Sequence, residues 1–268
     1  MSILSLTYLY IINRVLMIAA SLGILVLGVM ILVNKVKQTK ILGIHFIIFG
    51  VSSACSCFLT GSQRFLGVAV YARFSIIYNV INILTIFAML FCLCWYIHKT
   101  YGKKFIYIPV FAIEIVGRAA NRIVAIFLSK SLSGASAGYW ITMVMNINNL
   151  ITGTVTAVII ILAFYKNRDR ENIIPATWKI RIVLYAFNAL QFFYTISTYC
   201  FMIKLLKDRS YKPAGIFGFL FSDAPAYLIV TTFEVMTVLV NLIFPVYVLV
   251  KLKKANNKGI PEQTAEQI

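Results

Sequence analysis

The chain alternates between long apolar windows and short polar connections, from near its start to Val250. Each window is long enough to cross the roughly 30 Å hydrocarbon core of a bilayer as an α-helix. Lipid offers no hydrogen-bond partner to the backbone, so helices are the expected state for windows of this length. The seven windows cover residues 15–33, 41–60, 74–97, 105–128, 139–165, 180–206 and 226–250.

This pattern predicts an all-α fold: a polytopic membrane protein whose residues 1–250 form one seven-transmembrane-helix bundle. The first window is longer than the apolar region of a secretory signal, which is about 7 to 15 residues, so we interpret it as the first spanning helix. Residues 251–268 are expected to form a polar cytoplasmic tail without a lipidation or retention signal.

Composition agrees with a membrane location. Hydrophobic residues make up 61% of the chain and charged residues only 12%, whereas about a quarter of the residues in soluble domains are charged. The formal net charge of +17 comes from Lys and Arg scattered over many short connections. Such scatter does not make a nucleic-acid-binding face, and it favours contact with the anionic headgroups of the lipid bilayer.

The distribution of Lys and Arg among the connections predicts the orientation. One alternate set of connections holds 14 of these residues and the other holds 7. Because positively charged loops favour the cytoplasmic side, we expect the N-terminus outside and the C-terminus in the cytoplasm. We expect the protein to lie in a plasma or cell membrane. The richer set is 34–40, 98–104, 166–179 and 251–268, and the poorer set is the N-terminus, 61–73, 129–138 and 207–225.

The fourth window carries an unusual group of charges. Glu114, Arg118 and Arg122 follow each other at four-residue intervals, so they lie within an arc of about 80° on a helix, and Asn121 lies about 20° beyond Glu114. A charged side chain near the bilayer centre costs at least about 2.5 to 3.5 kcal/mol on insertion scales. We therefore expect this polar stripe to face the bundle interior or a water-filled cavity.

Further polar residues fall at a similar depth in the expected topology. Glu114 can pair with Arg118, which leaves Arg122 to pair with Glu234 of the last window or with a negatively charged ligand. Asparagines of the third and fifth windows, Asn148 among them, complete a predicted polar cavity open to the outside. The candidate residues for ligand binding or a charge network are Glu114, Arg118, Asn121, Arg122, Glu234, Asn79, Asn82, Asn146 and Asn149.

Motifs for chemistry are missing from the sequence. It holds no H-E-x-x-H, G-x-S-x-G or P-loop pattern, and no Lys in 226–250 that would form a retinal Schiff base. The two C-x-C pairs place their side chains on different sides of a helix, which is unlike a metal site. We therefore predict no enzyme activity, no catalytic residue, no metal site and no cofactor.

Three functional interpretations remain open. The first is a receptor-like sensor of a small polar or anionic ligand, whose basic loop between the fifth and sixth windows contacts a cytoplasmic or membrane protein partner. The second is a small-solute or ion transporter that uses the same charges. The third is an accessory membrane subunit in which the charges only lock helices together.

Overall fold

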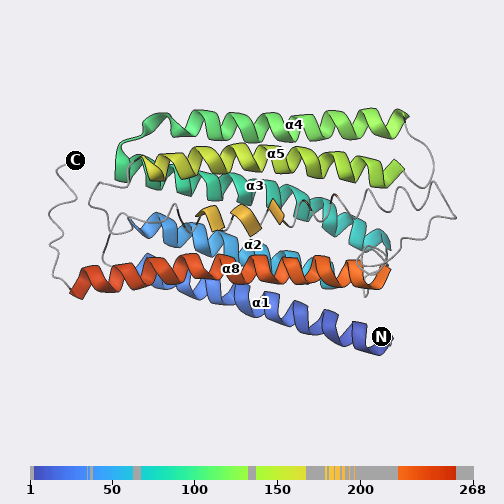
Figure 1. Cartoon of the computed structure of the whole chain (residues 1–268), viewed down its shortest axis with the longest axis horizontal. Helices are drawn as coiled ribbons and strands as arrows, with labels where there is room; N and C mark the ends of the chain where they lie inside the picture. Colours follow the sequence, from blue (N-terminus) through green and yellow to red (C-terminus); the bar gives the residue numbers. More distant parts are fainter. Residues whose placement is uncertain are drawn as a thin grey trace. The chain divides into compact units, whose positions relative to one another are not determined.

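The structure is a computed structural model, and the described part of the chain is helical. Within that part there are six α-helices, one short 3-10 helix and no strand, which confirms the predicted all-α class for these residues (Figure 1). The elements are α1 (Ile3–Val33), α2 (Lys40–Ser62), α3 (Val68–Tyr101), η2 (Lys104–Ile106), α4 (Tyr107–Ser131), α5 (Ala137–Tyr165) and α8 (Asp223–Asn257). The structure describes residues 3–34, 36, 39–62, 68–131, 137–166, 179, 181–183, 185–187, 189–190, 193, 196 and 223–257.

The helices are longer than several of the apolar windows. Helix α1 begins at Ile3, not at residue 15, and α8 continues to Asn257, beyond residue 250. Apolar windows mark only the part of a helix that lies in hydrocarbon, whereas polar turns can extend the same helix at either end. Most of the window 180–206 lies outside the described residues, and those of its residues that are described are helical.

Five helices in the described residues are long and apolar enough to cross a membrane. Their side chains also leave large apolar groups exposed, such as Phe58 at 73% and Leu84 at 63%. Such a surface suits lipid and not water, so the chain is a membrane protein. The candidate spans are Ile11–Val33, Lys40–Phe58, Val80–Tyr101, Trp140–Tyr165 and Val235–Lys254.

The chain divides into two compact units. Helix α4 belongs to the first unit except for its first residue, and α2 and α3 belong to the second, while α1, α5 and α8 each contribute to both. The first unit comprises Met1–Asn13, Ile108–Ile159 and Ile182–Thr237, and the second comprises Arg14–Tyr107, Ile160–Arg181 and Val238–Ile268.

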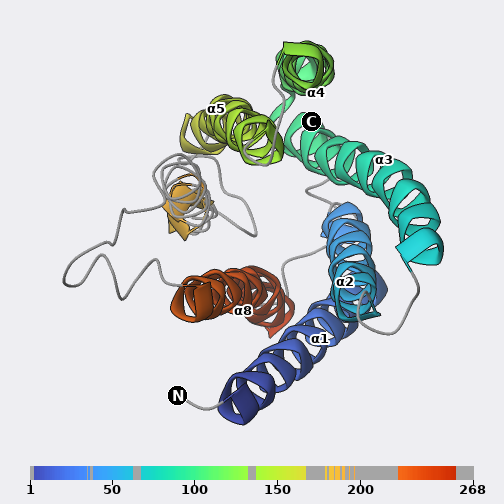
Figure 2. The ribbon, with the colours of Figure 1, turned by 90° about the vertical axis from the view of Figure 1, so that its right-hand side faces the viewer.

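In the second unit, α1 and α2 lie side by side along a seam of small residues (Figure 2). A Cβ atom at Gly43 would come within 2.7 Å of the backbone nitrogen of Leu32, and one at Gly50 within 2.8 Å of the carbonyl oxygen of Ser21. The hydroxyl of Ser21 donates a hydrogen bond of 2.9 Å to Ser53. Small residues let membrane helices approach closely, because lipid supplies little hydrophobic force to hold them together.

Helix α2 also packs on other helices of the second unit. His45 Nδ1 lies 3.1 Å from the carbonyl oxygen of Met89 in α3. A carbonyl only accepts hydrogen bonds, so Nδ1 carries the proton in this contact. The neighbouring Phe46 meets Phe244 of α8 edge-on, with ring centres 5.0 Å apart. These contacts join α2, α3 and α8 around a common apolar core.

Candidate functional site

The predicted polar stripe lies on α4, which packs against α5 in the first unit (Figures 1 and 2). The buried residues of α4 are Val110, Gly117 and Asn121, which recur at helical spacing. A Cβ atom at Gly117 would come within 2.7 Å of Thr152 Cγ2. The absence of a side chain at Gly117 therefore lets the two helices approach closely at this point.

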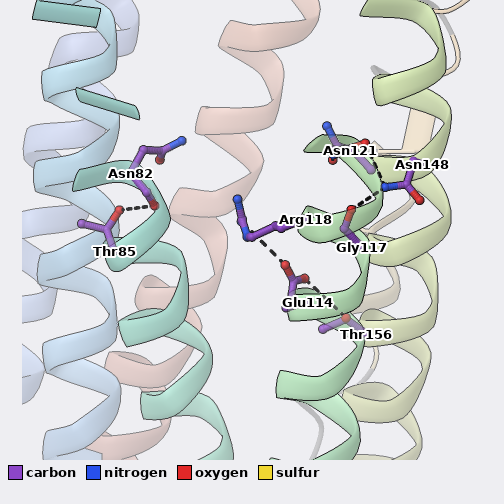
Figure 3. A network of polar contacts seen from close by, with 9 residues as sticks. Asn82, Thr85, Glu114, Gly117, Arg118, Asn121, Asn148 and Thr156 are labelled. Carbon is purple, nitrogen blue, oxygen red and sulfur yellow. Dashed lines mark hydrogen bonds and ion pairs between the residues drawn. The ribbon is translucent and has the colours of Figure 1, made fainter. Parts of the chain in front are cut away.

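Three asparagine side chains link the helices next to this close approach (Figure 3). Asn148 Nδ2 donates to the carbonyl oxygen of Gly117 at 2.7 Å and to Asn121 Oδ1 at 2.9 Å. Asn121 Nδ2 in turn donates to Asn149 Oδ1 at 2.6 Å. Hydrogen bonds between membrane helices stabilise by about 0.6 kcal/mol on average, so this group holds α4 and α5 in register.

Glu114 and Arg118 form an ion pair on the flank of the same seam. Arg118 Nη2 lies 3.6 Å from Glu114 Oε2. The side chain of Arg118 is 31% exposed and that of Glu114 is 13% exposed. The second carboxylate oxygen, Oε1, accepts a hydrogen bond of 3.5 Å from the hydroxyl of Thr156 in α5. Both oxygens of Glu114 are thus engaged, while Arg118 points away from α5 (Figure 3).

Arg122 stands at the outer end of the polar stripe, where its side chain is exposed. The buried face of α4 is centred near Val110, Gly117 and Asn121. At about 100° per residue, Glu114, Arg118 and Arg122 lie about 40°, 80° and 120° from that centre. The stripe therefore winds progressively out of the seam towards Arg122, and whether Arg122 faces the bundle interior or a water-filled cavity stays a prediction.

Among the residues whose side chains are described, the hydrogen bonds of this network do not include Asn82 or Asn146. Asn82 belongs to the second unit, where its carbonyl oxygen accepts a hydrogen bond of 2.9 Å from Thr85. Asn146 is half-buried in α5. Asn79 and Glu234 lie on described helices, but their side chains are outside the described part of the structure. The pairing of Arg122 with Glu234 and the cavity open to the outside stay predictions.

Sequence reasoning missed Gly117, Thr152 and Thr156 as members of the network. A signal for them was present: Asn148, Thr152 and Thr156 recur every four residues, as small polar residues do along a helix seam. A further hydrogen bond of α5 joins Thr154 to the hydroxyl of Tyr185. This contact ties α5 to the described helical residues 185–187 of the first unit.

A second unpredicted feature is Arg181, which belongs to the second unit. Its guanidinium carbon lies 5.0 Å from the ring centre of Phe164 and 4.8 Å from that of Phe244. Among the described residues, the buried atoms Nε and Nη2 of Arg181 have no hydrogen-bond partner. Sequence analysis did not single out Arg181, because a basic residue near the start of a spanning window is common.

Comparisons of the chain with family models, curated proteins and solved structures gave no match. The network on α4 and α5 combines the guanidinium of Arg118, the carboxylate of Glu114 and the amides of three asparagines. Groups of this kind can bind polar or charged molecules.

Proposed function

We propose that the chain is a seven-helix membrane protein with its N-terminus outside and its C-terminus in the cytoplasm. Five of the spans correspond to helices that are apolar enough to cross a membrane. The sixth is α4, whose 25 residues extend about 37 Å at 1.5 Å per residue. Its charges at Glu114, Arg118 and Arg122 lower its hydropathy without shortening it. Residues 180–206 supply the seventh.

We further propose that this protein is a receptor-like sensor of a small polar or anionic ligand. The ligand binds at the charged face of α4, defined here as Glu114, Arg118 and Arg122. The observation that carries this proposal is the exposure of Arg122 on the same helix face as Glu114, whose carboxylate Arg118 and Thr156 already engage. An arginine exposed on a spanning helix is costly in lipid. An anionic ligand in a hydrated site supplies the missing complement to its charge.

Thermal unfolding of the detergent-purified chain tests this proposal. The probes are glutamate, citrate and inorganic phosphate, each titrated at constant ionic strength. A ligand of the folded state raises stability by about 2.7 kcal/mol at a hundred times its Kd. We expect at least one probe to raise the Tm of the wild type saturably, and the Arg122→Gln variant to lose most of that rise.

The matched control is Lys130→Gln, which removes an exposed cation at the end of the same helix. It should keep the full response, because Lys130 lies two turns beyond Arg122. Equal responses in the wild type and in an Arg118→Gln/Arg122→Gln double variant would contradict a ligand site at this face. Uptake of the same probe into reconstituted vesicles would instead favour the transporter interpretation.

An accessory membrane subunit is the second candidate function. It is favoured by the way the amides of Asn121, Asn148 and Asn149 bond to one another. In this case the exposed Arg122 faces a carboxylate of a partner helix in the membrane. Purification in a mild detergent should then recover a stoichiometric membrane partner, and Arg122→Gln should release it.

A further inference from the structure

In the second unit, two nitrogen atoms of the Arg181 guanidinium have no hydrogen-bond partner among the described residues. Arg181 is not part of the charged face of α4. The rings of Phe164 and Phe244 lie close to its guanidinium carbon, at 5.0 and 4.8 Å. Contacts of this kind engage the faces of the planar guanidinium through the negative faces of the aromatic rings.

The two nitrogen atoms without a partner among the described residues are Nε and Nη2 of Arg181. These atoms share one edge of the guanidinium group, and their N–H bonds form the parallel fork that binds a carboxylate in two-point fashion. A buried donor left without an acceptor costs about 1 to 3 kcal/mol, and more when it is charged. Two such donors on one edge therefore indicate an absent acceptor with negative charge.

The surroundings of Arg181 are aromatic and closely packed. Phe164 stacks on Tyr96 and meets Tyr101 edge-on, with ring centres 6.1 and 5.9 Å apart. Tyr96 and Tyr101 are each at most 3% exposed. No carboxylate of the described residues forms an ion pair with Arg181. The cluster thus supplies one positive charge in a setting of low polarity.

We propose that the Nε and Nη2 edge of Arg181 binds a small monovalent anion, either a halide or a carboxylate group. One negative charge balances the single guanidinium. A doubly charged phosphate would leave excess negative charge beside aromatic faces that already repel it. Arg181 as a whole is half-buried, but its Nε and Nη2 atoms are covered, so binding of the anion requires the surrounding side chains to move aside. The bound anion stabilises the packing of α5 and α8 around Arg181.

The experiment follows Tm by tryptophan fluorescence as chloride replaces methanesulfonate at fixed ionic strength, with the full chain in detergent. A parallel titration uses formate, which separates a halide from a carboxylate. We expect at least one of the two anions to raise Tm saturably, by up to about 10 °C. Arg181→Gln should abolish this rise, and Arg181→Lys, which keeps the charge but loses the fork, should weaken it.

Lys130→Gln is the control, because it removes an exposed cation of the first unit that belongs to neither proposed site, and it should leave the rise in Tm intact. Arg122→Gln tests the proposed sensor and Arg181→Gln tests this site, so the two proposals fail separately. If Arg181→Gln does not fold, the wild type crystallised in bromide and in formate decides the matter. Anomalous bromide density or formate density at the Arg181 edge supports the site. An unoccupied edge in both crystals, or an undiminished rise in a folded Arg181→Gln variant, overturns it.

Discussion

Gly117 of α4 lies directly against Thr152 of α5, so closely that a Cβ atom at Gly117 would come within 2.7 Å of Thr152 Cγ2. The amide of Asn148 reaches the carbonyl oxygen of the same glycine at 2.7 Å. The helix that carries Glu114, Arg118 and Arg122 is therefore attached to its neighbour at a point where a side chain is absent. Close backbone approach and an amide hydrogen bond act there together.

Replacement of Gly117 by Ala should destabilise the protein. The added methyl group overlaps Thr152, and Thr152 is β-branched and has little rotamer freedom on a helix. Overpacking of this kind costs about 1 to 3 kcal/mol. Thermal unfolding in detergent should show a lower Tm for Gly117→Ala, and a Gly117→Ala/Thr152→Ala double variant should recover part of the loss.

Gly153 provides the matched control, since a Cβ atom there meets nothing within 4 Å. Gly153→Ala should leave Tm unchanged or raise it, because Ala favours the helix more than Gly does. A Gly117→Ala variant that unfolds at the same temperature as Gly153→Ala would show that the helices do not approach closely at Gly117.

The helices could be predicted from hydropathy, but the faces of α4 could not. Apolar length alone marks a spanning helix, which is why the window 139–165 matches α5 (Ala137–Tyr165) within two residues. Charge spacing, in contrast, shows only that Glu114, Arg118 and Arg122 lie on neighbouring parts of one helix. It does not show which side of the helix packs against a neighbour. The close approach at Gly117 determines that side, and the sequence alone does not show that another helix lies against this glycine.

Arg181 was beyond sequence reasoning for a different reason. A basic residue near a window end is usually an interfacial anchor. Its burial depends on Phe164 and Phe244, which lie 17 and 63 positions away along the chain and are brought to it only by the fold. No local pattern encodes contacts at such separations.

Asn148 should contribute more to stability than Asn146. Asn148→Leu removes the donor of two hydrogen bonds, at 2.7 and 2.9 Å, and leaves Asn121 Oδ1 without this partner. Membrane hydrogen bonds are worth about 0.6 kcal/mol on average and up to about 1.7, so the variant should lose about 1 to 2 kcal/mol in chemical or thermal unfolding. Asn146→Leu is the control, since the described hydrogen bonds of the seam do not include Asn146. Similar losses in both variants would contradict the special position of Asn148.

Glu114 and Arg118 should show energetic coupling in a double-mutant cycle. Each single replacement by Gln leaves the other charge in a partly buried place, whereas the double replacement removes both charges. The double variant should therefore lose less stability than the sum of the single variants, by about 0.5 kcal/mol or more. Thermal unfolding of the four proteins measures this difference. Strict additivity would mean that the 3.6 Å contact does not contribute to stability.

The orientation of α4 can be tested at its two ends, where Lys103 and Lys130 are both exposed. The predicted topology places Lys103 in the cytoplasm and Lys130 outside. Single cysteines introduced at these positions, in a chain whose exposed Cys55 is replaced by Ser, should react differently with a membrane-impermeant maleimide. Residue 130 should be labelled in intact cells, and residue 103 only after permeabilisation. Labelling of both from one side would show that α4 does not cross the membrane. Arg122 would then face water and need no ligand, so this result would remove the main support for the proposed sensor.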